Sequence, residues 1–428
     1  MAVIQFMKCF NLALAGALTL LYLYQVGYLG IGLIQRVRRR AKPLSAPETL
    51  RKYAAVISAR NEEVVIGDLV RSLKAQKYPR ELLDVYVIAD NCTDDTAGAA
   101  EAAGATVLRR FNKVQVGKGY ALDFFFRHLM DRELDGQYAG YLIFDADNLV
   151  EEHFVYEMNR TFETGDFDAI TCYRNSKNYG DNWISAGYSI WFLREARFVN
   201  GPRMALGTNC AVSGTGFLVS EAAIQRNGGW PFHLLTEDIQ FSINAAVEGH
   251  RIGYCERAVI YDEQPTTFRQ AWDQRLRWSK GFYQVNAKYF GSLVKNIFKG
   301  GRHGTSCSDM LMTVAPGSLV NILLIAVNLL LCLVCITQPA YVVMRVLDMT
   351  GAGILGTFLG LYQMLLLYGG LTVISEWRHI HTSAGKKLLY LLTFPLFMLT
   401  YIPISVAALF QKVEWKPIQH RAIANPVA

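Results

Sequence analysis

The sequence predicts an α/β domain with a mostly parallel sheet, placed between helices that are long and apolar enough to cross a membrane. Between about residues 50 and 265, short apolar runs alternate with helical patterns, as expected for parallel strands joined by helices. On both sides of this region the chain carries long apolar runs. Composition agrees, because 52% of the 428 residues are hydrophobic and 18% are charged, which is too apolar for an ordinary soluble enzyme.

Four short apolar runs in the first half of the α/β region predict strands, at Tyr53–Ser58, Val85–Asp90, Thr106–Leu108 and Tyr141–Asp145. The helices between them are predicted at Glu62–Gln76, Thr93–Gly104 and Gly117–Asp131. Polar residues follow three of these strands, at Ser58–Arg60, Asp90–Asn91 and Asp145–Asp147. Because parallel sheets bind ligands at the carboxyl ends of their strands, these three polar ends predict the binding site.

The first apolar segment, Phe10–Ile34, predicts a membrane anchor. A cleaved signal peptide would carry basic residues before a shorter apolar core, whereas here they follow the segment. These residues are Arg36, Arg38, Arg39, Arg40 and Lys42. Their order predicts an N-terminus outside the cell and a following domain in the cytosol. Since the net charge of +7 reflects basic residues beside apolar runs, a membrane lipid rather than nucleic acid is the expected partner.

Three further apolar runs follow the α/β region and predict membrane spans, at Leu311–Ile336, Ile354–Ile374 and Leu388–Phe410. Pro395 and Pro403 leave two arrangements open for the last run, a single span or an interfacial piece followed by a span. The side of the C-terminus stays open with them. The chain is thus divided into an anchor (10–34), an α/β domain (50–265), amphipathic helices (266–300), membrane helices (311–410) and a tail (411–428).

Two aromatic stripes, Trp183–Phe192 and Phe282–Phe298, have two interpretations. Helices at a membrane interface carry such stripes, and so do helices packed in a core; the sequence leaves both open. The eight cysteines are scattered, and the C-x-x-C pair Cys332 and Cys335 lies inside an apolar run. Neither a disulfide framework nor a zinc site is therefore predicted, which fits a reducing compartment.

The acidic strand ends are candidates for binding a phosphate-bearing ligand. Asp145 and Asp147 form a D-x-D pair whose carboxylates suit Mg²⁺ or Mn²⁺ bridging diphosphate oxygens. Acids in an ordinary surface turn give the same pattern. Asp90 comes before the next helix, where Thr93 or Asp94 is the expected N-cap, so Asp90 is a candidate for hydrogen bonding to a nucleotide base.

Two motifs later in the chain, T-E-D and Q-x-x-R-W, add catalytic candidates. Thr236, Glu237 and Asp238 begin a predicted helix over Ile239–Glu248. A threonine cap followed by acids is ordinary helix chemistry, but Asp238 also suits a general base that deprotonates a hydroxyl. The residues of Q-x-x-R-W, which share one helix face, are Gln274, Arg277 and Trp278.

The arginine of Q-x-x-R-W would neutralise a departing diphosphate, and the tryptophan would stack on a sugar ring. Interfacial Arg and Trp at a membrane edge are the alternative. Lys118 opens a predicted helix and would meet a phosphate or a base; a solvated lysine is the alternative there.

Taken in order and spacing over residues 54–284, these motifs resemble the family 2 glycosyltransferases, which have the GT-A fold. The processive branch, which makes cellulose, chitin, hyaluronan and poly-N-acetylglucosamine, is the most similar. The resemblance implies that the donor nucleotide binds Ser58, Arg60, Glu62, Asp90 and Lys118, with Asp145 and Asp147 on the metal and UDP. It implies acceptor or diphosphate contacts at Gly214, Thr215, Glu237, Gln274, Arg277 and Trp278, a catalytic base at Asp238 and, more loosely, a gating role for Trp415.

The function implied by the resemblance is inverting sugar transfer from UDP-glucose or UDP-N-acetylglucosamine to a growing β-linked polysaccharide, coupled to export. The expected protein is multi-pass in the plasma membrane with a cytosolic catalytic domain, and an accessory subunit is a candidate partner. The alternative is a non-processive enzyme that adds one sugar to a membrane lipid, giving a glycolipid. A non-catalytic membrane subunit is a third hypothesis, disfavoured by the complete set of motifs.

Overall fold

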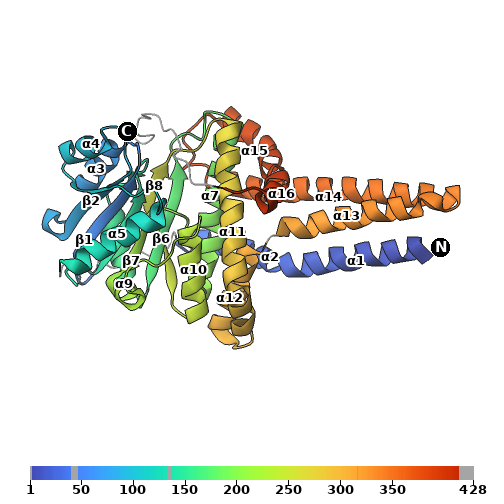
Figure 1. Ribbon diagram of the computed structural model, residues 1–428, viewed down its shortest axis with the longest axis horizontal. Coiled ribbons are helices and arrows are strands. Elements are labelled where there is room, and N and C mark those ends of the chain that lie inside the picture. Colours follow the sequence, from blue (N-terminus) through green and yellow to red (C-terminus); the bar gives the residue numbers. More distant parts are fainter. Residues whose placement is uncertain (1, 40–46, 133–135, 316, 414–428) are drawn as a thin grey trace.

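The computed structural model describes residues 2–39, 47–132, 136–315 and 317–413. Figure 1 shows a sheet with helices on both faces, from which a long rod of helices projects. The eight strands are β1 (Tyr53–Ala59), β2 (Leu83–Asp90), β3 (Thr106–Arg110), β4 (Gly140–Asp145), β5 (Leu149–Val150), β6 (Ala169–Ser176), β7 (Phe217–Ser220) and β8 (Ile252–Asp262). The four predicted strands are confirmed as β1 to β4; β5 to β8 were not predicted.

The strands form one mixed, mostly parallel sheet in the order β3-β2-β1-β4-β7-β6-β8-β5. Strands β1, β2, β3 and β4 are parallel, with Tyr53 level with Leu83 and Gly140. The short β7 runs antiparallel to both β4 and β6, and β8 is parallel to β6. Because β7 is antiparallel to both of its neighbours, β4 and β6 run in the same direction, and β8 and β1 run with them. Their carboxyl ends therefore meet at one edge of the sheet, and the predicted fold class is confirmed.

The helices cover both faces of the sheet with separate hydrophobic cores. On one face lie α3 (Ile66–Lys74), α4 (Thr96–Ala102) and α6 (Phe154–Phe162). On the other face lie α5 (Lys118–Asp131), α7 (Trp183–Glu195), α9 (Glu221–Asn227) and α10 (Glu237–Glu248). The predicted α7 stripe is core packing, because most of α7 is buried between the sheet and later helices.

Two helices start later than predicted because loop contacts compete for their first turns. The Glu62 N–H donates to the Thr96 hydroxyl at 2.8 Å, and α3 starts only at Ile66. The predicted caps of α4, Thr93 and Asp94, are wrong: Asp95 is the N-cap and accepts from the Gly98 N–H. The Thr93 N–H instead donates to the side-chain oxygen of Asn61, which joins the loops after β1 and β2.

Helices α11 (Phe268–Ile297) and α12 (Gly301–Val314) pack against α10. The aromatic stripe of α11 is divided between core and surface. Val285, Tyr289 and Leu293 are buried against α10 and α12, whereas Phe290 is 52% exposed and Phe298, just after the helix, is 84% exposed. Core packing thus explains the buried side of the stripe. The exposed apolar residues on its other side agree with the membrane-interface interpretation.

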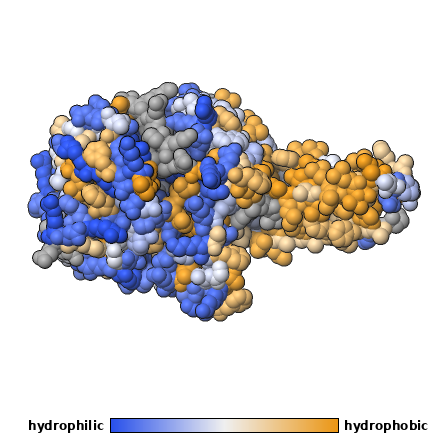
Figure 2. All heavy atoms as spheres, viewed as in Figure 1, coloured by the Kyte–Doolittle hydropathy of each residue, from blue (hydrophilic) through white to orange (hydrophobic). Residues whose placement is uncertain are grey.

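The rod consists of α1 (Ala2–Tyr22), α13 (Gly317–Val334) and α14 (Ala340–Ser375), and its surface is hydrophobic (Figures 1 and 2). By length and composition, three segments of the described chain are able to cross a membrane: Ala2–Gln35, Ala340–Ser375 and Ala384–Phe410. A shorter apolar helix covers Ile322–Thr337. The predicted span Leu311–Ile336 is wrong at its start, because residues 311–314 end α12 and pack in the globular part.

The last apolar segment lies against the globular part that contains the sheet, and outside the rod. It forms α15 (Ala384–Leu399) and α16 (Tyr401–Phe410), which pack beside α7 and α11 (Figure 1). Arg275 on α11 donates to the Phe397 carbonyl at 3.1 Å and to the Thr400 hydroxyl at 2.7 Å. Val413 packs on α11 and α16, so the described chain ends beside the globular part that contains the sheet. The predicted gating residue Trp415 lies outside the described residues.

A buried carboxylate joins the rod to the sheet. Glu376, which follows α14, is fully buried and accepts hydrogen bonds from Arg197 and Tyr173 at 2.6 Å each. The His379 ring lies 2.9 Å away. Burial alone would raise the pKa of Glu376, but these hydrogen bonds outweigh it and lower the pKa to about 2. The carboxylate therefore stays charged, and α14 stays tied to β6 and to the π-helical turn η2 (Ala196–Asn200).

Candidate active site

A cavity of about 1130 Å³ opens at the carboxyl edge of the sheet. Among the described residues predicted for the site, those lining it are Ser58, Arg60, Glu62, Asp90, Lys118, Asp145, Asp147, Gly214, Glu237, Asp238, Gln274, Arg277 and Trp278. Thr215 is 2% exposed and lies behind the wall. Segments that are up to 220 residues apart in sequence are thus gathered at one place, as the strand ends predicted.

Lys118 stands at the centre of the site. It is the first residue of α5, after Gly117 with its φ of 129°. Its ammonium group donates to Asp145 at 2.5 Å and to the Gly214 carbonyl at 2.6 Å. The lysine therefore ties the D-x-D strand end to the small-residue loop before β7, and its side chain is only 12% exposed.

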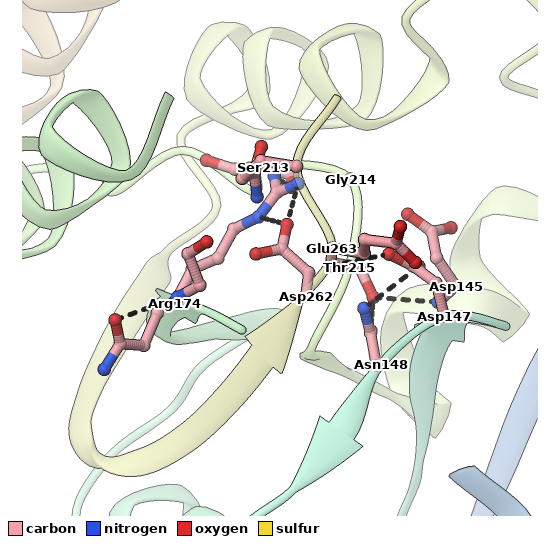
Figure 3. A network of polar contacts seen from close by, with 12 residues as sticks. Asp145, Asp147, Asn148, Arg174, Ser213, Gly214, Thr215, Asp262 and Glu263 are labelled. Carbon is pink, nitrogen blue, oxygen red and sulfur yellow. Dashed lines mark hydrogen bonds and ion pairs between the residues drawn. The ribbon is translucent and has the colours of Figure 1, made fainter. Parts of the chain in front are cut away.

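The D-x-D turn is held by hydrogen bonds from two other segments, at Thr215 and Glu263 (Figure 3). The Thr215 hydroxyl accepts from the Asp145 N–H at 2.8 Å and bonds to the Asn148 side chain. Asp147 is 8% exposed, and one of its oxygens accepts from the Glu263 N–H at 3.0 Å. Thr215 thus supports the turn from behind, and its predicted contact with acceptor or diphosphate stays a prediction.

A buried ion pair lies beneath the D-x-D turn. Arg174 at the end of β6 donates to Asp262 at the end of β8 at 2.5 Å and to the Ser213 carbonyl at 2.9 Å (Figure 3). Its guanidinium also stacks 3.7 Å from the centre of the Phe192 ring. Burial raises the pKa of Asp262, with Arg174 opposing that rise. Neither residue was predicted, because β6 and β8 were not recognised as strands.

Asp90, the predicted base-binding residue, is paired within the protein. Arg110 at the end of β3 donates to it at 2.6 Å, and both side chains are almost fully buried. Burial raises the pKa of Asp90, and Arg110 opposes this effect. The next residue, Asn91, has a φ of 55° and donates to Asp90 at 3.0 Å. A non-glycine residue with positive φ after a strand is a conformational signal that the sequence alone did not reveal.

Glu237 and Asp238 occupy the first turn of α10 and face the cavity. Thr236 holds the N-cap position, but its hydroxyl makes no cap hydrogen bond and is buried without a partner in the described part of the chain. Burial raises the pKa of Asp238, and the carboxylate of Asp145 raises it further, while Lys118 opposes the rise. Burial and Asp238 together raise the pKa of Glu237 to about 7. The two acids form a coupled pair that titrates above the ordinary carboxylate range.

Gly214 separates the acid of α10 from the D-x-D pair. A Cβ atom built on Gly214 would lie 3.7 Å from Asp238 Oδ2 and 3.9 Å from Asp145 Oδ2. Its φ of 80° also favours glycine. The two carboxylates therefore face a shared space that a glycine keeps open.

The Q-x-x-R-W residues form the next part of the wall, on α11. Arg277 donates to the Leu235 carbonyl at 3.3 Å. Trp278 meets the rings of Tyr188 and Phe192 edge-on, with centroid distances of 5.8 and 6.2 Å. Gln274 has a buried amide oxygen with no partner among the described residues. An unpaired buried acceptor beside a cavity is suited to a ligand hydroxyl.

The same cavity continues to the base of the rod. Its far wall includes Leu18, Leu23, Val26, Leu361, Leu365 and Met398, from α1, α2 (Tyr24–Arg39), α14 and α15. One open space therefore joins the acidic strand ends to apolar helices of membrane-spanning length.

The two D-x-D carboxylates fit a divalent cation. Both line the cavity, and one oxygen of Asp145 already meets a cation, the Lys118 ammonium. Carboxylate oxygens are the ligands that Mg²⁺ and Mn²⁺ prefer. The donor chemistry of the two residues therefore agrees with the predicted metal.

Comparison with known proteins supplies the class of protein that this fold and site define. The family described as glycosyltransferase like family 2 matches residues 51–281, and the chain belongs to this family. Its fold is accordingly the GT-A fold of the family 2 glycosyltransferases.

Two named relatives have different acceptors. A β-monoglucosyldiacylglycerol synthase of Synechocystis sp. is 26% identical over 265 residues, covering 59% of this chain and 54% of that protein. A poly-β-1,6-N-acetyl-D-glucosamine synthase of Staphylococcus epidermidis is 22% identical over 241 residues, covering 56% of this chain and 57% of that protein. The chain spans about half the length of the curated relatives it matches.

One solved structure resembles nearly the whole chain. The mannosyltransferase from Pyrobaculum calidifontis, in complex with GDP-Man and Mn²⁺, has a TM-score of 0.55 and 17% sequence identity. The likeness covers 94% of this chain and 99% of that one, so it includes the helices as well as the sheet. At this identity it supports the fold alone.

Proposed function

We propose that this protein transfers a single sugar from a UDP-sugar to the hydroxyl of a membrane lipid. The observation that carries the proposal is the cavity, which runs from the acidic strand ends to the apolar helices at the base of the rod. A lipid with its headgroup at the carboxylates and its tails along these helices would fit this space. The lipid acceptor of the diacylglycerol-modifying relatives supports the same choice over the polysaccharide expected from the sequence.

In the proposed reaction Asp238 takes the proton of the acceptor hydroxyl. Its position across Gly214 from Asp145, beside the space where the donor sugar would be held, supports this role. The hydroxyl oxygen then bonds to the anomeric carbon as the bond to UDP breaks. Attack from the face opposite UDP inverts an α-linked donor and gives a β-linked product.

Lys118 and Arg277 provide positive charge for the leaving diphosphate. Both line the cavity, and electrostatic stabilisation of developing charge is a major part of transferase catalysis. Asp145 and Asp147 would hold Mg²⁺ or Mn²⁺, which would supply further neutralisation of the diphosphate. Asp90 and its partner Arg110 lie where the first strands end and would contact the nucleotide base.

The test uses the full chain, purified in detergent with Mg²⁺ or Mn²⁺. UDP-glucose and UDP-N-acetylglucosamine, each radiolabelled, are offered together with diacylglycerol in mixed micelles. We expect label in a lipid-extractable product of one sugar per lipid, identified by mass spectrometry, and none with Asp238→Asn. High-molecular-weight polymer from the wild type would refute the proposal and support the polysaccharide synthase expected from the sequence.

A further inference from the structure

Three arginines close to the cavity have carboxylate partners, in the pairs Arg174–Asp262, Arg197–Glu376 and Arg203–Asp309. The side chains of these arginines are 16%, 10% and 3% exposed. In each pair the arginine pKa is raised despite burial, because the carboxylate stabilises its charge. This is the usual condition for a charge removed from water.

Arg194, at the end of α7, differs from these three. Its guanidinium donates to the amide oxygen of Gln25 at 3.0 Å and lies 5.0 and 5.4 Å from the ring centres of Trp191 and Tyr368. The neighbouring carboxylate, Glu195, instead accepts from the Ser213 hydroxyl. Among the described residues Arg194 has no ion pair, and burial lowers its pKa. A cation in this position lacks the partner that its surroundings require.

The position of Arg194 indicates what would supply that partner. Arg194, Gln25 and Tyr368 line the cavity where α2, α7 and α14 meet. This is the end of the cavity beside the rod, beyond the aromatic residues around Trp278. Tyrosine and tryptophan beside arginine, at the base of apolar helices, are typical of the level at which lipid headgroups lie.

We propose that Arg194 binds the phosphate of an anionic lipid that enters the cavity from the membrane side. The planar guanidinium presents two parallel donors that match phosphate oxygens, and among the described residues the Gln25 amide is its one hydrogen-bond acceptor. The inference rests on the proposed function in that a lipid uses this cavity. Two lipids would satisfy it: an anionic acceptor, or a second lipid seated beside a neutral acceptor.

Arg275 shows why a missing carboxylate alone is insufficient for this argument. It too is buried without an ion pair among the described residues, but it donates to the carbonyls of Ala271 and Phe397 and to the Thr400 hydroxyl. Three protein oxygens surround that guanidinium, and it does not line the cavity. Arg194, in contrast, lines the cavity and donates to one acceptor among the described residues, the Gln25 amide.

The experiment measures lipid binding and transfer separately. The full-length protein in dodecyl maltoside, a detergent without phosphate, is mixed with phosphatidylglycerol, and retained lipid is counted by native mass spectrometry. Sugar transfer is then measured in micelles with diacylglycerol, phosphatidylglycerol, or both. The variants are Arg194→Gln, Arg194→Lys and, as a matched loss of positive charge at an exposed site, Lys288→Gln.

We expect wild type and Lys288→Gln to retain phosphatidylglycerol and Arg194→Gln to bind it roughly tenfold more weakly, as for loss of a charged hydrogen bond. Arg194→Lys should restore part of the binding, because it keeps the charge. Between about 50 and about 500 mM salt the difference should persist, since buried pairs are poorly screened. Unchanged UDP affinity and melting temperature in Arg194→Gln would show that this variant is folded.

The products distinguish the two sources of phosphate. Glycosylated phosphatidylglycerol would make the anionic lipid the acceptor, whereas faster glycosylation of diacylglycerol alone would make it a second lipid; both support the inference. Equal lipid retention by wild type and Arg194→Gln would overturn it, even if diacylglycerol is glycosylated. Polymer formation with Arg194-dependent lipid retention would instead overturn the proposed function and leave this site standing.

Discussion

Replacing Asp238 with asparagine, with Glu237→Gln as the matched control, tests which of two adjacent buried acids acts as the base. Asparagine keeps the shape of Asp238 but cannot accept the proton, so kcat should fall about 10²- to 10⁴-fold, the usual contribution of a general base. Glu237 has a pKa of about 7, so at pH 7 roughly half of the molecules already carry it uncharged. Its replacement by neutral glutamine should therefore lower kcat far less than Asp238→Asn does.

The pH profile adds a second, independent measurement. Because burial raises the pKa of Asp238, the ionised base appears only above the ordinary aspartate range, and wild-type kcat should fall as the pH drops through the coupled pair. Glu237 titrates above Asp238, so it is already uncharged where Asp238 takes up its proton, and Glu237→Gln should leave the acid limb almost unchanged. Initial rates of UDP release across the pH range, at saturating donor, provide the assay. A larger loss in Glu237→Gln than in Asp238→Asn would reverse the assignment.

Three further changes test the surrounding structure. Gly214→Ala should destabilise the fold by about 1–2 kcal/mol, because alanine is strained at a φ of 80°. It should also lower kcat, because the added methyl group enters the space between the carboxylates. Thermal unfolding measures the first effect and steady-state rates the second, and a fully active variant would contradict the second. Arg110→Met should lower the free energy of unfolding by about 3–5 kcal/mol and weaken UDP binding, because it leaves the buried Asp90 carboxylate without its partner. Calorimetric titration with UDP measures the binding, and an unchanged affinity would show that Asp90 lies away from the nucleotide base. Asn11→Leu should lower detergent-resistant stability by about 1 kcal/mol by breaking the reciprocal amide pair with Asn328 in the rod, while the double leucine variant should recover most of the loss.

The parts of the fold that follow from local sequence were predictable. Strands β1, β2 and β4 are apolar runs that end in polar residues, and helices α5 and α11 have clear starts and periodicity, so their bounds agree within a few residues. Their polar ends meet because parallel strands share an edge, which is a property of topology that needs no side-chain detail. The T-E-D and Q-x-x-R-W residues lie on α10 and α11, and only the family resemblance predicted that they share a cavity with the D-x-D pair.

The parts that depend on distant partners were not predictable. Arg174 and Asp262 are 88 residues apart, and their pairing requires β6 beside β8, which no local pattern indicates. The last apolar segment has the length of a span, but Arg275 binds its backbone at Phe397 and holds it against the catalytic domain. Hydropathy alone cannot distinguish a helix that faces lipid from one that packs on protein.

The buried Glu376 carboxylate has a consequence for which lipids are within reach. With its pKa lowered to about 2, it stays ionised across the physiological range, and its bonds to Arg197 and Tyr173 fix α14 rigidly to the sheet. In the proposed lipid transferase, a rod fixed in this way would set the height of the cavity carboxylates above the bilayer midplane. A hydroxyl close to the glycerol backbone of a lipid and one on a longer headgroup lie at different distances from the midplane. The enzyme would then select acceptor lipids by this distance, and the contacts of Glu376 would set the distance that it accepts.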